Sequence, residues 1–134
     1  MYSMPNLKLA EEWLAFAAKS LETAILLNRE NHYTDVIAID IQQTVEKSLK
    51  AFYAFEGVKI PRTHSLDILF SYANKKVHFT GVEIKDIIII SDYYESERYP
   101  GPKYFQPNRS EINHVLEVAQ SIYQQLKQYI NTPL

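Results

Sequence analysis

The sequence predicts an all-α protein, an up-and-down four-helix bundle with one additional short helix. Apolar residues recur at steps of three and four along its long segments, which is the spacing of amphipathic helices. The chain has only three glycines, and its six prolines lie near the ends or between the periodic segments. Its 134 residues are enough to bury one core, so residues 1–134 are interpreted as a single domain.

The first two helices are predicted from a long apolar stripe on each. The first runs from about Leu7 to Asn28, and the short connection after it makes the second an antiparallel neighbour. The second spans about Tyr33 to Gly57, with Thr34 as its N-cap and Gly57 as the left-handed residue that ends it. The two stripes are Ala10, Trp13 or Leu14, Ala17, Leu21, Ala24 and Ile25, and then Ile37, Ile41, Val45, Leu49, Phe52 and Phe55.

A polar strip runs along the other side of the second helix. It consists of Gln43, Glu46, Lys47 and Lys50, whose spacing of three and four residues places them on one face. By pattern alone, the strip is a solvated face with two ordinary pairs, Gln43 with Lys47 and Glu46 with Lys50.

A short third helix is predicted after the loop at residues 59–64. Thr63 or Ser65 is the expected N-cap, and the helix continues to about Asn74. His64 lies at the end of the loop, where a hydrogen bond that fixes the loop is a simpler role than contact with a ligand.

The fourth helix is predicted to follow a capping box formed by Thr80 and Glu83 and to end near Glu97. Its run of four isoleucines, residues 87–90, also suits a buried strand. We favour a helix because the capping box precedes the run and no second strand is visible to pair with it.

This fourth helix has more apolar surface than one core covers. We expect two faces: a core face of Ile84, Ile87, Ile88 and Tyr94, and a second face of Ile89, Ile90 and Tyr93. Two-fold pairing buries such a face against itself, so we predict a homodimer through the fourth helix. The alternative is a monomer in which the third helix and residues 75–79 cover the second face.

The segment from Arg98 to Pro107 contains three prolines and cannot continue a helix. A last helix follows, capped by Asn108 or Ser110, with Glu111 in its first turn. Its stripe is Ile112, Val115 or Leu116, Ala119, Ile122 or Tyr123, Leu126 and Ile130.

The composition narrows the classes of function. The chain has no cysteine, no apolar stretch of membrane-spanning length and no basic, then apolar, N-terminal segment. We therefore expect a cytoplasmic protein without membrane contact and without a metal or other cofactor. The net charge of −2 argues against a general binder of RNA or DNA, although RNA at a local basic site stays open.

The pattern Gln42-Gln43-x-x-Glu46-Lys47-x-x-Lys50-Ala51 resembles the signature of the HEPN domain family, whose name refers to nucleotide binding. Three further segments stand in the order that this family shows: Trp13-Leu14 before the motif, and Arg62-Thr63-His64-Ser65-Leu66 and Arg98-Tyr99-Pro100 after it. The resemblance implies a non-catalytic nucleotide- or partner-binding module that works with a minimal nucleotidyltransferase. The ligand-binding residues expected from it are Gln43, Glu46, Lys47, Lys50, Arg98 and Tyr99, with Glu46 and Arg98 in contact.

Many HEPN proteins are metal-independent ribonucleases that use an arginine followed after four to six residues by a histidine. Arg98 stands where the family has the arginine, but Lys103, Tyr104 and Phe105 stand where the histidine is needed. A second arginine and histidine with this spacing, Arg109 and His114, supply the alternative, an RNA-cleaving toxin component of a toxin–antitoxin pair. A third hypothesis is that the protein is a purely structural dimerisation bundle.

Overall fold

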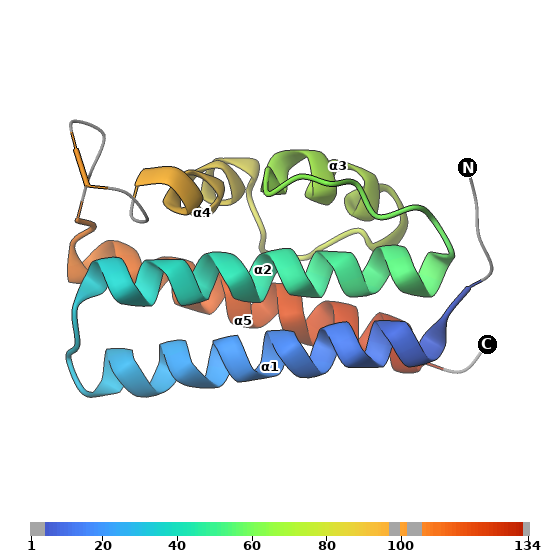
Figure 1. Cartoon of the computed structure of the whole chain (residues 1–134), viewed down its shortest axis with the longest axis horizontal. Coiled ribbons are helices and arrows are strands. Elements are labelled where there is room, and N and C mark those ends of the chain that lie inside the picture. Colours follow the sequence, from blue (N-terminus) through green and yellow to red (C-terminus); the bar gives the residue numbers. More distant parts are fainter. Residues whose placement is uncertain (1–4, 97–99, 102–105, 133–134) are drawn as a thin grey trace.

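The computed structural model describes residues 5–96, 100–101 and 106–132, and these contain five α-helices and no strand (Figure 1). The helices are α1 (Leu7–Arg29), α2 (Thr34–Glu56), α3 (Leu66–Val77), α4 (Ile84–Ser96) and α5 (Arg109–Asn131). The predicted all-α helical bundle is confirmed. None of the described helices is long and apolar enough to span a membrane.

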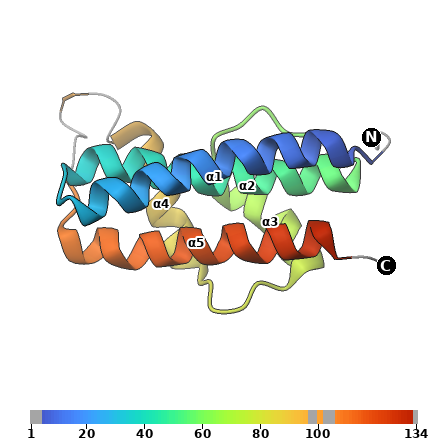
Figure 2. The same cartoon turned by 90° about the horizontal axis from the view of Figure 1, so that it is seen from below.

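The three long helices α1, α2 and α5 lie side by side along the length of the molecule, and the short pair α3 and α4 covers α2 from the opposite side (Figures 1 and 2). α2 packs against each of the other four helices, whereas α1 packs only on α2 and α5. Because α2 is enclosed in this way, fourteen of its twenty-three residues are buried. Its position in the middle of the molecule decides the environment of its polar residues.

The main core forms between α2, α5 and the inner faces of α3 and α4. Fully buried Ile37, Ile41, Leu49 and Phe52 of α2 belong to it, as their predicted stripe requires. The α1–α2 seam is lined by small residues of α1, because Ala10, Ala17 and Ala24 recur every seven residues and are fully buried. The predicted stripes of these two helices are thereby confirmed in outline.

The two ends of α2 differ from each other in how well the sequence predicts them. Gly57 takes the predicted left-handed conformation with φ of 72°, and the Val58 amide donates to the Tyr53 carbonyl at 3.0 Å. The prediction of Thr34 as N-cap is wrong. Tyr33 holds the capping position, and Thr34 is the first helical residue, with its side chain buried and its hydroxyl without a partner among the described residues.

The predicted start and orientation of α4 are also wrong. Gln125 of α5 binds both the backbone N–H and C=O of Thr80 at 2.9 Å, so the capping box does not form and α4 begins at Ile84. The core face is Ile87, Ile90 and Tyr93, whereas Ile84 and Ile88 are 54% and 48% exposed. In this orientation Asp86 of the first turn lies buried against His114 of α5, a contact that the apolar pattern does not predict. The predicted end at Glu97 lies outside the described residues.

The remaining helix ends agree more closely with prediction. The Asn108 side chain caps α5 by accepting from the Glu111 amide at 2.8 Å. α3 begins after Ser65, as predicted, but continues beyond Asn74 to Val77. The Ser65 hydroxyl does not cap α3; it donates to the Asp67 carboxylate instead.

Candidate functional site

The polar strip of α2 is not a solvated face, because its side chains are buried or half-buried and contact α1 and the loop at 58–65. Glu46 is 5% exposed and accepts hydrogen bonds from Gln42 Nε2 at 2.8 Å and Lys50 Nζ at 2.8 Å. His64 Nδ1 lies 3.0 and 3.1 Å from the two carboxylate oxygens. Gln43 joins this network by donating to Gln42 at 2.7 Å. Neighbouring side chains of α2 and one loop histidine thus surround a single buried carboxylate.

The contacts of Glu46 keep it ionised. Burial alone raises the pKa of a carboxyl group, but the hydrogen bonds from Lys50, Gln42 and His64 outweigh burial, and the pKa of Glu46 lies below its usual value. The nearby ammonium group of Lys50 balances the negative charge. Glu46 is therefore a fixed acceptor that can orient the groups around it.

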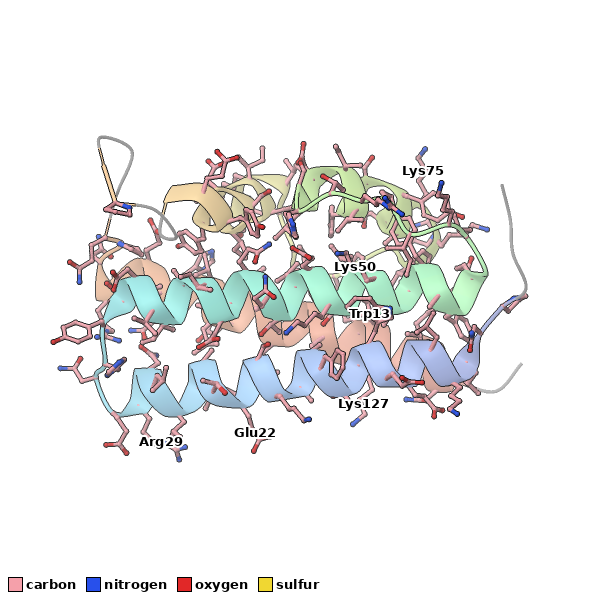
Figure 3. All side chains as sticks on the ribbon, viewed as in Figure 1. Trp13, Glu22, Arg29, Lys50, Lys75 and Lys127 are labelled. Carbon is pink, nitrogen blue, oxygen red and sulfur yellow. The ribbon has the colours of Figure 1, made fainter. Side chains whose placement is uncertain are left out.

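The two lysines of the strip are committed to the α1–α2 seam. Lys50 binds Glu46, as one predicted pair requires, and its Nζ lies 5.6 Å from the centre of the Trp13 ring (Figure 3). Lys47 does not pair with Gln43; its Nζ donates to the Ser20 hydroxyl of α1 at 3.2 Å. Each ammonium group has three N–H donors, so one partner leaves further donors, and the predicted ligand-binding role of these lysines stays a prediction.

His64 fixes its loop, as its simpler predicted role requires. Its ring stacks on that of Tyr94 in α4, with the ring centres 3.9 Å apart and the planes inclined by 12°. The start of α3 is held too, because the Leu66 amide donates to the Ser91 hydroxyl of α4 at 2.9 Å. The loop at 58–65 is thus tied to α2 through Glu46 and to α4 through Tyr94.

An open cleft of about 700 Å³ lies between this loop and α4. Its described lining consists of Arg62, Thr63, His64, Ser65, Ser91, Asp92, Tyr94 and Glu95. Sequence reasoning missed the α4 residues of this cleft, and it did not assign Arg62 to a site. The motif Arg62-Thr63-His64-Ser65-Leu66 was the available signal, since it places Arg62 two residues from a histidine. The predicted site residues Arg98 and Tyr99, and the predicted Glu46–Arg98 contact, lie outside the described residues.

The alternative catalytic residues, Arg109 and His114, have their hydrogen-bond partners in different parts of the fold. Arg109 donates to the Asn28 side chain at 2.7 Å and to the His32 carbonyl, both in or after the last turn of α1. His114 Nε2 lies 3.0 Å from Asp86 of α4. The two side chains therefore join α5 to different elements. Among the described residues, no three His, Cys, Asp or Glu side chains are grouped to hold a metal ion.

Five described helices, with a buried carboxylate on the central one and a cleft beside it, define an all-α helical bundle. Residues 10–129 match the model of the HEPN domain, and the chain belongs to this family. Two solved structures share the fold. One is TT1696 from Thermus thermophilus, with 24% identity and a TM-score of 0.75 over 89% of this chain and 96% of the other.

The second is ST0689, described as an archaeal HEPN homologue, with 22% identity and a TM-score of 0.69 over 91% of this chain and 98% of the other. At these identities, the two structures show only that the fold is shared. None of the curated proteins matches this chain.

Proposed function

We propose that this protein is a non-catalytic cytoplasmic HEPN module that binds a nucleotide and works with a minimal nucleotidyltransferase. The observation that supports it is the Glu46 network at the side of a cleft. Glu46 fixes His64, and His64 lines the cleft beside Arg62, so a cation and an oriented ring stand together at an accessible surface. In this proposal the ligand lies in the cleft, and Arg98 and Tyr99, which lie outside the described residues, stay predicted ligand-binding residues.

Calorimetry with nucleoside mono-, di- and triphosphates at low salt tests nucleotide binding. We expect heat of binding from at least one of them, and a weaker signal from Arg62→Gln, since that change removes a cation of the cleft. No heat at millimolar ligand would remove the nucleotide from the proposal.

Co-expression with a minimal nucleotidyltransferase encoded beside the chain tests the partner. Separate elution of the two proteins would remove the partner from the proposal.

The ribonuclease alternative finds less support. Arg109 is bonded to Asn28 of α1 and His114 to Asp86 of α4, so both side chains already have structural partners. We expect no metal-free cleavage of a mixed RNA substrate by the purified protein. Cleavage that disappears in His114→Ala would restore this alternative.

The exposed isoleucines favour assembly with a second copy of the chain. Ile84 and Ile88 of α4 and Ile68 of α3 are each about half exposed, and α3 and α4 pack against one another. A two-fold interface uses the same surface of both copies, so pairing through this face buries the isoleucines of one copy against those of the other.

Light scattering with a matched pair of variants tests this homodimer. We expect a dimeric wild type that becomes monomeric in Ile88→Glu. Leu26→Glu is the control, because Leu26 of α1 is also 48% exposed but lies on another face. A monomeric wild type, or a dimer that persists in Ile88→Glu, would exclude the proposed interface.

A further inference from the structure

His64 presents a flat ring surface to the cleft. The ring of Tyr94 covers one face of the imidazole, with the ring centres 3.9 Å apart and the planes inclined by 12°. The Nδ1 edge is turned to the two carboxylate oxygens of Glu46, at 3.0 and 3.1 Å. Nevertheless 49% of the side-chain surface is exposed, and the side chain lines the cleft. The exposed half therefore belongs to the second face of the ring and to the edge away from Nδ1.

Two contacts fix the orientation of this ring. The hydrogen bond at Nδ1 lies in the ring plane, so Glu46 fixes the direction in which the Nδ1 edge points. The stack on Tyr94 fixes the rotation of the plane about that direction. Both contacts are compatible with a neutral or a protonated imidazole, because Nδ1 can carry a hydrogen in either state. The ring is thus held in place before a ligand arrives, which lowers the cost of binding on it.

An oriented ring face at an open cleft suits a flat ligand. Aromatic faces bind nucleobases by stacking, and every base has a π-face that can take part. The cleft, of about 700 Å³, has the size of an ordinary small-molecule site. A base that lies on the exposed face of His64 extends the existing pair of rings into a column of three: the base, His64 and Tyr94.

We infer that the cleft binds a nucleotide through the face of its base, stacked on His64, and that it prefers purines to pyrimidines. This inference rests on the proposed nucleotide-binding function and assigns the ligand class and its main contact to that site. The preference follows from area, because the two fused rings of a purine cover more of an aromatic platform than the single ring of a pyrimidine. Stacking makes no use of the edges of the base, so purines with different edges bind alike.

Calorimetry at low salt with AMP, GMP, IMP, CMP, UMP and ribose 5-phosphate tests the assignment. We expect the three purine nucleotides to bind within about threefold of one another, and each about fivefold more tightly than CMP and UMP. Ribose 5-phosphate has the sugar and the phosphate but no base. It is expected to bind about tenfold more weakly than AMP, since a stacked base contributes at least this much.

His64→Phe and His64→Leu form a matched pair of variants that isolates the ring face. Both lose the hydrogen bond to Glu46 and both introduce an apolar side chain, but only phenylalanine retains a flat aromatic ring. We expect His64→Phe to bind AMP about tenfold more tightly than His64→Leu does. Far-UV circular dichroism and urea denaturation check that the two variants are folded alike.

Proton NMR of the wild type gives a second measurement, which does not depend on the stability of a variant. A base stacked on His64 lies in the ring current of the imidazole, and the imidazole lies in that of the base. We therefore expect the H2 and H8 signals of AMP and the carbon-bound ring protons of His64 to move upfield on binding. With ribose 5-phosphate the His64 signals are expected to move much less.

The outcomes separate this inference from the proposed function. If none of the six ligands binds, both fail. If nucleotides bind but CMP and UMP equal the purine nucleotides, or ribose 5-phosphate equals AMP, the proposed function stands and this inference is overturned. A difference of more than about tenfold between AMP and IMP, equal AMP affinities of His64→Phe and His64→Leu, or AMP binding without upfield shifts overturns it as well.

Discussion

Glu46 is a charged group held in the interior by partners from two parts of the chain. It binds Gln42 and Lys50 within α2 and His64 from the loop at 58–65. Burying such a charge without partners costs free energy of folding. Removing the charge costs free energy as well, because its partners are left buried without it. The environment of Glu46 therefore links the stability of the fold to the orientation of His64 at the cleft.

Glu46→Gln tests this link through stability. The change leaves the Lys50 ammonium, with 13% of its side chain exposed, without its counter-ion. We expect the free energy of unfolding to fall by about 3 kcal/mol, the usual cost of breaking a buried ion pair from one side. Urea denaturation at pH 7 measures it. Glu22→Gln, at an exposed position of α1, is the control and should stay within about 0.5 kcal/mol of wild type.

The same residue predicts how stability depends on pH. The pKa of Glu46 is lower in the folded than in the unfolded state, so the unfolded chain binds more protons as the pH falls. Its stabilisation is complete above the unfolded pKa of about 4.3 and is lost as the pH falls through the folded value. Burial raises the pKa of Asp40, which acts with the opposite sign. The difference between wild type and Glu46→Gln in urea titrations from pH 7 to pH 3 isolates Glu46; a difference that does not shrink below pH 4 would contradict the prediction.

At the scale of helices, α2 and α4 differ in how well their sequences predict which face enters the core. In α2 the apolar stripe has one phase and Gly57 fixes the end, so its core face is predictable. In α4 four consecutive isoleucines cover most of the circumference, and the apolar period has no unique phase. The phase comes from tertiary contacts: Ile87, Ile90 and Tyr93 enter the core, and Asp86 lies buried against His114. The candidate site was also harder to predict, because tertiary contacts assemble it. It joins Glu46 of α2, the loop at 58–65 and α4, which are distant in the sequence.

Two alanine variants test the orientation of α4. Ile90 is fully buried, and Ile90→Ala is expected to lower the free energy of unfolding by about 3 kcal/mol. Ile88, two residues earlier, is about half exposed, and Ile88→Ala is expected to cost less than about 1 kcal/mol in the monomer. Urea denaturation at a concentration low enough to dissociate any dimer compares them. Equal losses, or a larger loss in Ile88→Ala, would mean that α4 is rotated from the orientation described.

At the scale of the whole molecule, α2 is the helix through which the parts are connected. α3 and α4 do not pack on α1, so α2 and α5 connect these two sides of the fold. The cleft belongs to one side, because α4 and the loop at 58–65 form it, whereas Glu46 and its partners Gln42 and Lys50 belong to the centre. Local opening of the cleft therefore breaks the contacts of His64 with Glu46 and Tyr94 and that of Ser91 with Leu66.

Native-state hydrogen exchange tests this hierarchy. Amides in the middle of α2, around Val45 and Leu49, are enclosed by all four other helices and should exchange only through global unfolding. Amides of α3 and α4 should exchange faster, with a weaker dependence on urea, because this pair can separate from α2 while α1, α2 and α5 stay together. His64→Ala releases the loop from Glu46 and should accelerate exchange in α3 and α4 while leaving that of α1 unchanged beyond its global effect. Exchange in α2 that is as fast as in α4, or a uniform acceleration in His64→Ala, would show that the molecule opens as one unit.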